Sequence, residues 1–475
     1  PGVAVVADST WAAMKGRKAL DIRWKEGPHA AESTESLRRH FEEVIDQTAE
    51  VLRDDGDAEA ALAGAAQVVE ATYALPYLAH ATMEPMNATA HVHDGGAELW
   101  LPVQHPTWNR GAVAEALGLP PENVRVHTTL LGGGFGRRAN PDVAVEAALL
   151  SKAVGAPVQV VWSREDDIQH DFYRPANYHR LQAGLDEDGA VVAWQHRLST
   201  PAIGAYLFGR ETNGEGEARG AWDLPYGIPN LRVAYAPARS GVPRGWWRSV
   251  EHSYNGFVVN AFFDEVAAAA GRDPYELRLD LLDRTDPDAL AATLAARHGD
   301  RGDYAFDLAR YRNVLVTAAE KAGWGTPLPD GTGRGIAAHW SFLTYVAEVA
   351  EVTVGSGGQV VVNRVVCVVD CGQVVNPRTV EEQMEGAIIY GLTAALKGHL
   401  DVEHGRIVQS NFHDYEMLRM NEAPAIEVHL VPSTKPPSGA GEPGLPPAAP
   451  AVAAAIYDAT GKRVRRLPIA LDGLS

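Results

Sequence analysis

Cysteine is nearly absent from this 475-residue chain, which contains only Cys367 and Cys371. Two cysteines cannot build a disulfide scaffold or a four-cysteine zinc site. They also cannot hold an iron–sulfur cluster, because such clusters take four protein ligands. Any cluster chemistry must therefore come from another chain.

Long apolar runs and an excess of basic residues are also missing. No apolar stretch approaches the roughly 20 residues that a membrane-spanning helix needs. The net charge of −19 argues against a nucleic-acid partner, since phosphate binding requires clustered Lys and Arg. At 46% hydrophobic residues the chain can bury large cores, and its length predicts two or three domains.

The chain begins without an initiator Met, a charged leader or an apolar signal segment. We therefore expect a fragment, a processed subunit or one half of a split polypeptide, with any export signal upstream.

Apolar periodicity and capping residues predict a mixed set of helices and strands. Residues 21–55 are expected to form an exposed helix and linker, and 284–330 a surface excursion. The predicted helices are 10–18, 108–117, 142–154, 253–271, 274–282, 381–396 and 451–460. The predicted strands are 3–6, 68–73, 88–93, 98–103, 124–129, 158–162, 346–354, 360–370 and 462–469.

The most informative segment is Gly132-Gly133-Gly134-Phe135-Gly136-Arg137-Arg138, between a predicted strand and a predicted helix. Glycines let main-chain amides approach a bulky or anionic ligand, and the arginines add positive charge. The segment also satisfies a dinucleotide fingerprint, Gly134-x-Gly136-x-x-Ala139, with Glu165 and Asp166 where a ribose-binding acid belongs. Against that interpretation, the following helix is predicted to start only after Asn140-Pro141. A structural turn is the third possibility.

A second candidate is Glu442, in the loop 438–444 (SGAGEPG). A carboxylate among small residues is partly desolvated, which raises its pKa toward that of a general base. The alternative is an ordinary surface acid. Other candidate ligand contacts are Gln104, Arg248 and Gln383, with Trp246 and Trp247 as pocket walls or plain core residues.

Together these segments resemble the molybdenum-binding chain of the xanthine dehydrogenase and aldehyde oxidase family, nearest the branch of the isoquinoline 1-oxidoreductase β chain and aldehyde dehydrogenase. They occur in the family's order along the whole chain. The segments are 79–85 (AHATMEP), 104–106 (QHP), 132–137 (GGGFGR), 162–166 (WSRED), 170–175 (HDFYRP), 247–250 (WRSV), 370–372 (DCG) with 383–386 (QMEG), 441–443 (GEP) with 446–447 (PP), and 459–465 (ATGKRVR) with 467–468 (LP).

The resemblance implies a molybdopterin cofactor, expected in its cytosine dinucleotide form, with molybdenum held by the pterin rather than by protein ligands. It places Glu442 as the base in oxidising an aldehyde or N-heteroaromatic carbon with water-derived oxygen. It places the cofactor against Gln104, Gly133, Gly134, Phe135, Gly136, Arg137, Arg248, Gln383 and Gly441, and the substrate pocket at Trp246, Trp247 and Glu251.

The implied fold is α+β, with two intertwined molybdopterin-binding domains of mixed sheets at 63–330 and 331–475. Residues 1–62 would be the end of a hammerhead domain and a linker. The implied partners are the missing N-terminal half or a companion chain, and a small subunit with two [2Fe-2S] clusters. The compartment implied is the periplasm, otherwise the cytoplasm.

Three departures from the family pattern keep alternatives open. Pro1 resembles a point inside the family's hammerhead domain, Glu251 stands where relatives commonly have Gly, and the serine-rich nucleotide-contacting segment is not evident. The expected loss of the N-terminal half and Glu251 leave room for a cofactor-free hydrolase or scaffold half on the same fold. The fingerprint around Gly134 leaves room for an NAD(P)-dependent dehydrogenase.

Overall fold

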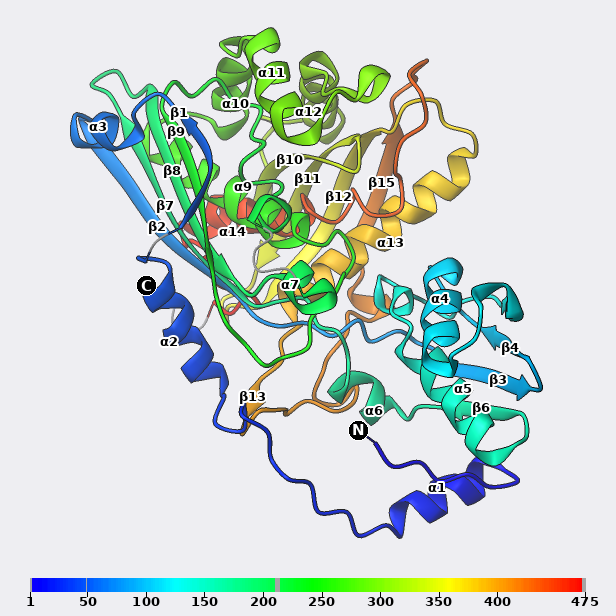
Figure 1. Cartoon of the computed structure of the whole chain (residues 1–475). Helices are drawn as coiled ribbons and strands as arrows, with labels where there is room; N and C mark the ends of the chain where they lie inside the picture. Colours follow the sequence, from blue (N-terminus) through cyan, green and yellow to red (C-terminus); the bar gives the residue numbers. More distant parts are fainter. Residues whose placement is uncertain (1, 48, 210–213, 472–475) are drawn as a thin grey trace.

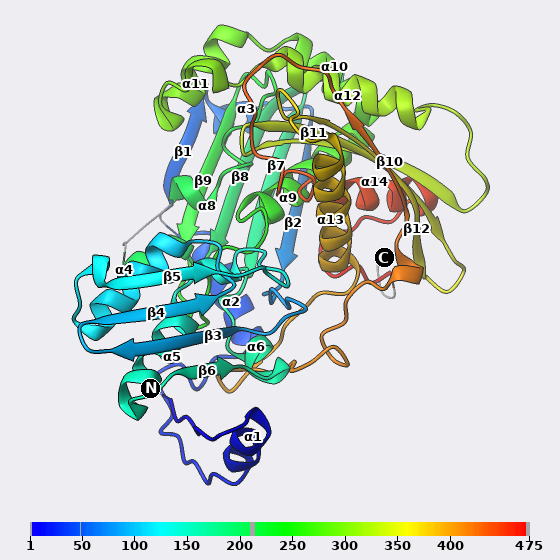
Figure 2. The same ribbon diagram turned by 90° about the vertical axis from the view of Figure 1, so that its right-hand side faces the viewer.

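The computed structural model describes residues 2–47, 49–209 and 214–471. Three multi-stranded sheets and the helices around them form the body of the molecule (Figures 1 and 2). The mixture of helices with mixed sheets confirms the predicted α+β class.

The largest sheet has five strands in the order β1-β9-β8-β7-β2. It is mixed, since β8 and β9 run parallel whereas the other neighbours are antiparallel. Its strands are β1 (Glu50–Asp55), β2 (Gln67–Leu75), β7 (Asn177–Leu185), β8 (Val191–Thr200) and β9 (Leu231–Pro237).

A four-stranded sheet in the order β10-β11-β12-β15 forms the second half of the core. Its strands are β10 (Thr332–Ser341), β11 (Thr344–Val354), β12 (Val360–Asp370) and β15 (Ala425–Leu430). Nearly every residue of β11 is buried, whichever face it points to. Such a strand must be covered on both faces, and α12 (Leu308–Ala322) and α14 (Ala448–Thr460) pack on it.

Helix α9 (His252–Ala269) joins the two sheets, because it packs against β2 and β7 of the first and β10 of the second. Its residues are buried all round from His252 to Ala267. A helix without a solvent face belongs to the centre of a large core. The segment that leads into α9 is therefore held in place by a helix that both sheets contact.

The third sheet is smaller and has its own core, with α4 (Pro106–Leu117) and α5 (Asp142–Val154) packed on it. Its order is β5-β4-β3-β6, from β3 (Asn87–His93), β4 (Gly96–Leu101), β5 (Val124–Thr128) and β6 (Val158–Val161). The glycine loop connects β5 to α5, and it contacts the rest of the chain, since Gly136 packs against the carbonyl of Trp246 and Phe135 against the ring of Tyr390.

The remaining elements connect these layers. Helix α1 has no buried residue and lies at the edge of the molecule (Figures 1 and 2), where Arg17 pairs with Asp166 of α6. Among the described residues, no helix is both long and apolar enough to cross a membrane. These elements are α1 (Thr10–Lys18), α2 (Thr34–Val44), α3 (Ala58–Ala63), α6 (Arg164–Gln169), α7 (Ile203–Phe208), α8 (Gly214–Glu217), α10 (Pro274–Asp283), α11 (Pro287–His298), α13 (Pro377–Leu396), β13 (Val402–Glu403) and β14 (Arg406–Ile407).

Four sequence predictions are wrong. Residues 3–6 and 462–469 form no strand; the second segment makes only an isolated bridge between Arg466 and Ala74. The stretch 284–330 is not merely a surface excursion, because α12 buries one face in the core. The segment 21–55 is not merely exposed, since α2 buries Leu37, Phe41 and Val44, and β1 joins the large sheet.

Candidate active site

The glycine loop adopts backbone conformations that L-residues avoid. Gly133 and Gly136 have φ of 97° and 107°, and Phe135 has φ of 53°. A Cβ on Gly134 would lie 2.6 Å from Oε1 of Gln104, and one on Gly136 only 1.5 Å from the carbonyl oxygen of Trp246. The loop's own packing therefore already requires glycine at these two positions.

The loop leaves three amides open. The N–H groups of Gly132 and Gly136 donate to Glu84 Oε2 (2.9 Å) and to Gln104 Oε1 (3.0 Å). Within the described parts of the chain, the N–H groups of Gly133, Gly134 and Phe135 donate to nothing. Because backbone donors are rarely left without an acceptor, this row fits oxygen atoms of a bound group.

Gln104 closes one side of the loop. Its Oε1 accepts from the N–H groups of Gly136 and Arg138, so the orientation of the amide is fixed. Its Nε2 has no partner among the residues described. The side chain is exposed, so it presents a free donor next to the open amides.

The two arginines are used inside the protein rather than offered to a ligand. Arg137 is 1% exposed and pairs with Asp142 (2.7 Å) and Asp171 (3.1 Å). Burial lowers the pKa of Arg137, but these carboxylates outweigh it and the net shift is upward. Arg138 donates from Nε to Gly133 O (2.7 Å) and pairs with Glu84 (3.0 Å). The positive charge of these arginines, which the sequence suggested for binding an oxyanion, is thus already neutralised by carboxylates of the protein.

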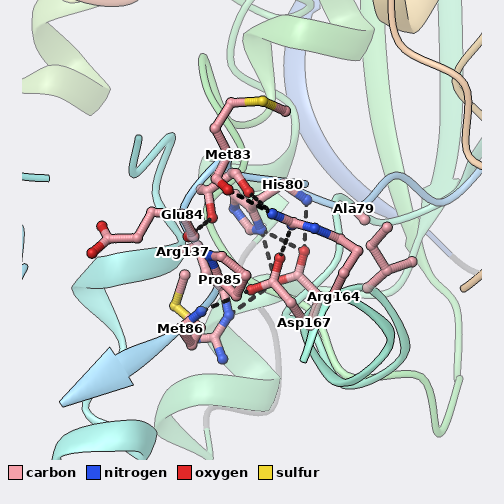
Figure 3. Close-up of polar contacts among 12 residues, drawn as sticks. Ala79, His80, Met83, Glu84, Pro85, Met86, Arg137, Arg164 and Asp167 are labelled. Carbon is pink, nitrogen blue, oxygen red and sulfur yellow. Dashed lines mark hydrogen bonds and ion pairs between the residues drawn. The ribbon is translucent and has the colours of Figure 1, made fainter. Parts of the chain in front are cut away.

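A buried polar network holds the glycine loop and the segment 79–86 in place (Figure 3). His80 lies 2.9 Å from Asp171 through Nδ1, and its Nε2 donates to Trp246 O at 2.9 Å. That is the carbonyl against which Gly136 packs. Arg164 bridges Asp167 and the carbonyl of Met83, so residues 79–86 are fixed to α6.

Glu442 is half-buried, and Ser249 contacts both its carboxylate and its carbonyl oxygen, which also accepts from Leu445 N–H at 3.1 Å. Ser249 donates its N–H to Oε1 (2.9 Å) and its hydroxyl to the carbonyl oxygen of Glu442 (2.7 Å). Oε2 has no partner in the described regions. Burial raises the pKa of Glu442, opposed by the Ser249 amide and by Arg248. A carboxylate with one fixed and one free oxygen and a raised pKa suits proton transfer.

Arg248 connects Glu442 to the glycine loop. Its guanidinium donates to the carbonyl of Gly441 from Nε (2.9 Å) and Nη2 (2.5 Å), and to Gln383 O (3.1 Å). The same guanidinium lies 6.0 Å from the ring centre of Phe135. The glycine loop, Gln383 and the residue before Glu442 therefore meet around one side chain.

A column of stacked rings lies behind Phe135. Phe135 stacks on Tyr390 with centroids 4.5 Å apart, and Tyr390 stacks on Trp247 at 4.6 Å. Trp247 is 2% exposed, donates to Ala79 O and carries the guanidinium of Arg174 at 5.3 Å. Trp247 thus lies in the core behind the site, whereas Trp246 is half-buried beside Trp108 and Phe208.

Glu251 lies just before α9 and is 6% exposed. Burial raises its pKa to about 8, although Arg219 pairs with it at 3.2 Å. The buried acid therefore pairs with an arginine that is itself exposed to solvent.

The structure does not support the interpretation of the glycine loop as a dinucleotide-binding fingerprint. Helix α5 begins only at Asp142, after the loop, as the sequence suggested. Glu165 accepts from Asn411 (2.8 Å), while Asp166 caps α6 and pairs with Arg17. Neither acid lies free near the glycines. Moreover, β6 runs antiparallel to β3, whereas a doubly wound nucleotide-binding sheet is mostly parallel.

Sequence reasoning gave no role to Ser249, His80 or Asp171, although they lie in the segments 247–250, 79–85 and 170–175 that carry the family resemblance, and it did not name Tyr390. Tyr390 lies seven residues after Gln383 on α13, two turns along one face, which is a usable signal. The residues alone could not show that Ser249 contacts Glu442, because the two are 193 positions apart in the sequence.

Comparisons with known proteins identify the family of this chain. Models described as molybdopterin cofactor-binding domains match residues 41–281 and 292–424. The chain is 32% identical to the beta subunit of isoquinoline 1-oxidoreductase of Brevundimonas diminuta, covering 98% of this chain and 59% of that protein. It is 31% identical to the membrane-bound aldehyde dehydrogenase [pyrroloquinoline-quinone] of Gluconacetobacter polyoxogenes, over 98% and 62% of the two chains. With the B subunit of nicotinate dehydrogenase of Pseudomonas putida it shares 30% identity, over 99% and 40%.

Solved structures share the fold at low identity. Quinoline 2-oxidoreductase from Pseudomonas putida 86 superposes with a TM-score of 0.79 at 15% identity, over 98% of this chain and 83% of that one. Aldehyde oxidoreductase from Desulfovibrio gigas gives 0.70 at 17%, over 89% and 62%. The chain spans about 60% of the length of the first two sequence relatives. It belongs to the xanthine dehydrogenase and aldehyde oxidase family of proteins with molybdopterin cofactor-binding domains.

Proposed function

We propose that this chain is the molybdenum-binding part of a hydroxylase that oxidises an aldehyde or N-heteroaromatic carbon with oxygen derived from water. The substrate classes come from the names of its relatives, which include an aldehyde dehydrogenase, an isoquinoline oxidoreductase and a nicotinate dehydrogenase. One observation carries the proposal: the guanidinium of Arg248 lies 6.0 Å from the ring centre of Phe135 in the glycine loop and donates to the carbonyl of Gly441, the residue before Glu442.

The residues present fit a molybdopterin group. The N–H groups of Gly133, Gly134 and Phe135, with Nε2 of Gln104, would donate to its oxygens, and Arg248 and Gln383 would border it. When bound, the cofactor supplies a two-electron acceptor and the oxygen-transfer chemistry. We expect its cytosine dinucleotide form.

The protein's own contribution is proton transfer and exclusion of water. Glu442 receives a proton at Oε2 while Ser249 keeps Oε1 in place. Trp246, with Trp108 and Phe208, forms a half-buried aromatic wall suited to a flat substrate. Glu251 would lie at the edge of this pocket, and Trp247 would support it from the core.

Partners and compartment belong to the same proposal. Electrons would leave through a small subunit with two [2Fe-2S] clusters, because Cys367 and Cys371 are the only cysteines of this chain. The remaining length of the relatives would be supplied by a companion chain or the missing N-terminal half. We place the enzyme in the periplasm.

Glu442→Gln tests the proposal in the assembled enzyme. The variant should lose turnover by at least about 10²-fold, since it keeps the shape but cannot accept the proton. Molybdenum by mass spectrometry and released pterin by fluorescence should stay at wild-type level. Turnover is followed with benzaldehyde and isoquinoline and a dye acceptor. Glu416→Gln, on an exposed acid, serves as control.

Retained turnover in Glu442→Gln would remove this residue from the mechanism. Ester or lactone hydrolysis that persists in molybdenum-free preparations would instead favour the cofactor-free hydrolase. Tight NAD binding without molybdenum would favour the dehydrogenase.

A further inference from the structure

Ser249 makes two hydrogen bonds to one distant residue. Its N–H donates to the carboxylate oxygen Oε1 of Glu442 at 2.9 Å, and its Oγ–H donates to the main-chain oxygen of Glu442 at 2.7 Å. The serine is 0% exposed. One side chain and one amide therefore fix both ends of Glu442, its carboxylate and its backbone.

The backbone of this serine is held in an unfavourable conformation. Ser249 and the following Val250 have φ of 70° and 46°, in the left-handed region that favours glycine. The surrounding turn maintains these angles: Val250 N–H donates to Trp247 O (2.6 Å) and Ser253 Oγ donates to Val250 O (2.6 Å). Strain of this kind persists where neighbouring structure enforces it, and it is concentrated at functional sites.

The turn is anchored on both sides. Only Glu251 separates Val250 from α9, which is buried from His252 to Ala267, so the turn cannot shift as a unit. On the other side Arg248 holds the carbonyl of Gly441, the residue before Glu442. The peptide groups before and after Glu442 are thus held by Arg248 and Ser249 respectively, while Oε2 is left without a partner in the described chain.

We propose that Ser249 is a positioning residue, which holds Oε1 and the backbone of Glu442 so that Oε2 is the atom that receives the proton. This inference rests on the proposed role of Glu442 as the base. The strained turn aims both donors of Ser249 at one residue. Arg248 is the charged side chain beside the carboxylate.

Ser249→Gly separates positioning from folding. Glycine adopts the left-handed conformation readily, so the variant should fold, retain molybdenum and melt near the wild-type temperature. It lacks Oγ, and its backbone is free to leave the strained angles. We expect kcat with benzaldehyde to fall about tenfold at an unchanged KM, because the base is less well placed.

The pH profile supplies a readout that a merely structural role would not move. Ser249→Gly keeps the backbone N–H but loses the Oγ–H that fixes the backbone of Glu442, so the carboxylate is no longer held against that N–H. A carboxylate that moves away from an N–H donor holds its proton more tightly, so the acid limb of kcat/KM should move to higher pH. Infrared difference titration of the cofactor-free chain gives the same quantity without turnover. The Glu442 band is the one that is absent in Glu442→Gln.

Ser151→Ala is the matched control, because Ser151 is also 0% exposed and its Oγ donates to a main-chain oxygen, that of Ala156 at 2.8 Å, away from Glu442. It should leave kcat and the acid limb unchanged. Wild-type kcat and an unshifted limb in Ser249→Gly, or equal shifts in Ser151→Ala, would overturn the inference. If Glu442→Gln retained turnover, the proposed function would fail, and the infrared titration would still decide whether Ser249 governs the Glu442 carboxyl.

Discussion

The carbonyl oxygen of Trp246 lies where a side chain on Gly136 would begin. An ideal Cβ on Gly136 would be 1.5 Å from that oxygen, and the φ of Gly136 is 107°. His80 Nε2 donates to the same carbonyl at 2.9 Å. The small-sheet unit and the segment leading into α9 therefore meet backbone to backbone at this point.

Gly136→Ala should be strongly destabilising. The methyl group cannot be accommodated unless the Trp246 backbone moves, and the positive φ adds strain. We expect a loss of about 3 kcal/mol or more in the free energy of unfolding, with loss of bound molybdenum. Urea denaturation and metal analysis measure both.

Gly118→Ala isolates the contribution of the backbone angle. Gly118 has φ of 70° but a Cβ there would meet nothing within 4 Å. It should cost only about 1 kcal/mol. Equal losses in the two variants would show that the contact with Trp246 is unimportant.

Local signals in the sequence were enough for many elements. Ser9 caps α1, and Gly118 and Gly155 end α4 and α5 in the left-handed conformation, all as expected from capping patterns. The predicted strand at 462–469 does not form, because the alternation of polar and apolar residues cannot show whether a strand finds a pairing partner. For α12 the apolar face was present, but only the fold shows that β11 covers it.

The site was less accessible to sequence reasoning. Glu442 and the glycine loop could be paired only through a family resemblance, because more than 300 residues separate them. Arg137 was expected to offer charge to a ligand. Its true partner Asp171 lies on a different segment, and only the three-dimensional structure brings the two together.

Glu251 predicts a pH dependence of stability. Its pKa is raised from 4.5 to about 8 in the folded chain, mainly by burial. Between these values the native state binds a proton that the unfolded state does not, so stability falls as the pH rises through this window. Glu251→Gln removes the titrating group. Its melting temperature should fall less than that of wild type from pH 5 to pH 8.5, by at least about 2 °C.

Arg219→Met provides the complementary variant. Arg219 opposes the raised pKa of Glu251 by pairing with it at 3.2 Å. Removing this partner should steepen the loss of stability toward high pH. Parallel melting curves for all three proteins would contradict the assignment to Glu251.

Substitutions can separate the acceptor and the donor function of the Gln104 side chain. Its Oε1 accepts from Gly136 and Arg138, and its Nε2 is the free donor next to the open amides. Gln104→Glu keeps an acceptor for both N–H groups, so the loop and the thermal stability should stay near wild type. The added charge and the lost donor should cut turnover by about 10²-fold.

Gln104→Ala removes both functions. The N–H groups of Gly136 and Arg138 lose their acceptor, so the unfolding free energy should drop by about 1–3 kcal/mol, and hydrogen exchange in the loop should accelerate. If Gln104→Glu destabilised the chain as much as Gln104→Ala, the proposal that Oε1 stabilises the loop as an acceptor for the two N–H groups would be wrong. If Gln104→Glu kept full turnover, Nε2 would have no part in binding the cofactor. Only the combination of a stable loop and lost turnover assigns the two halves of this amide to two tasks.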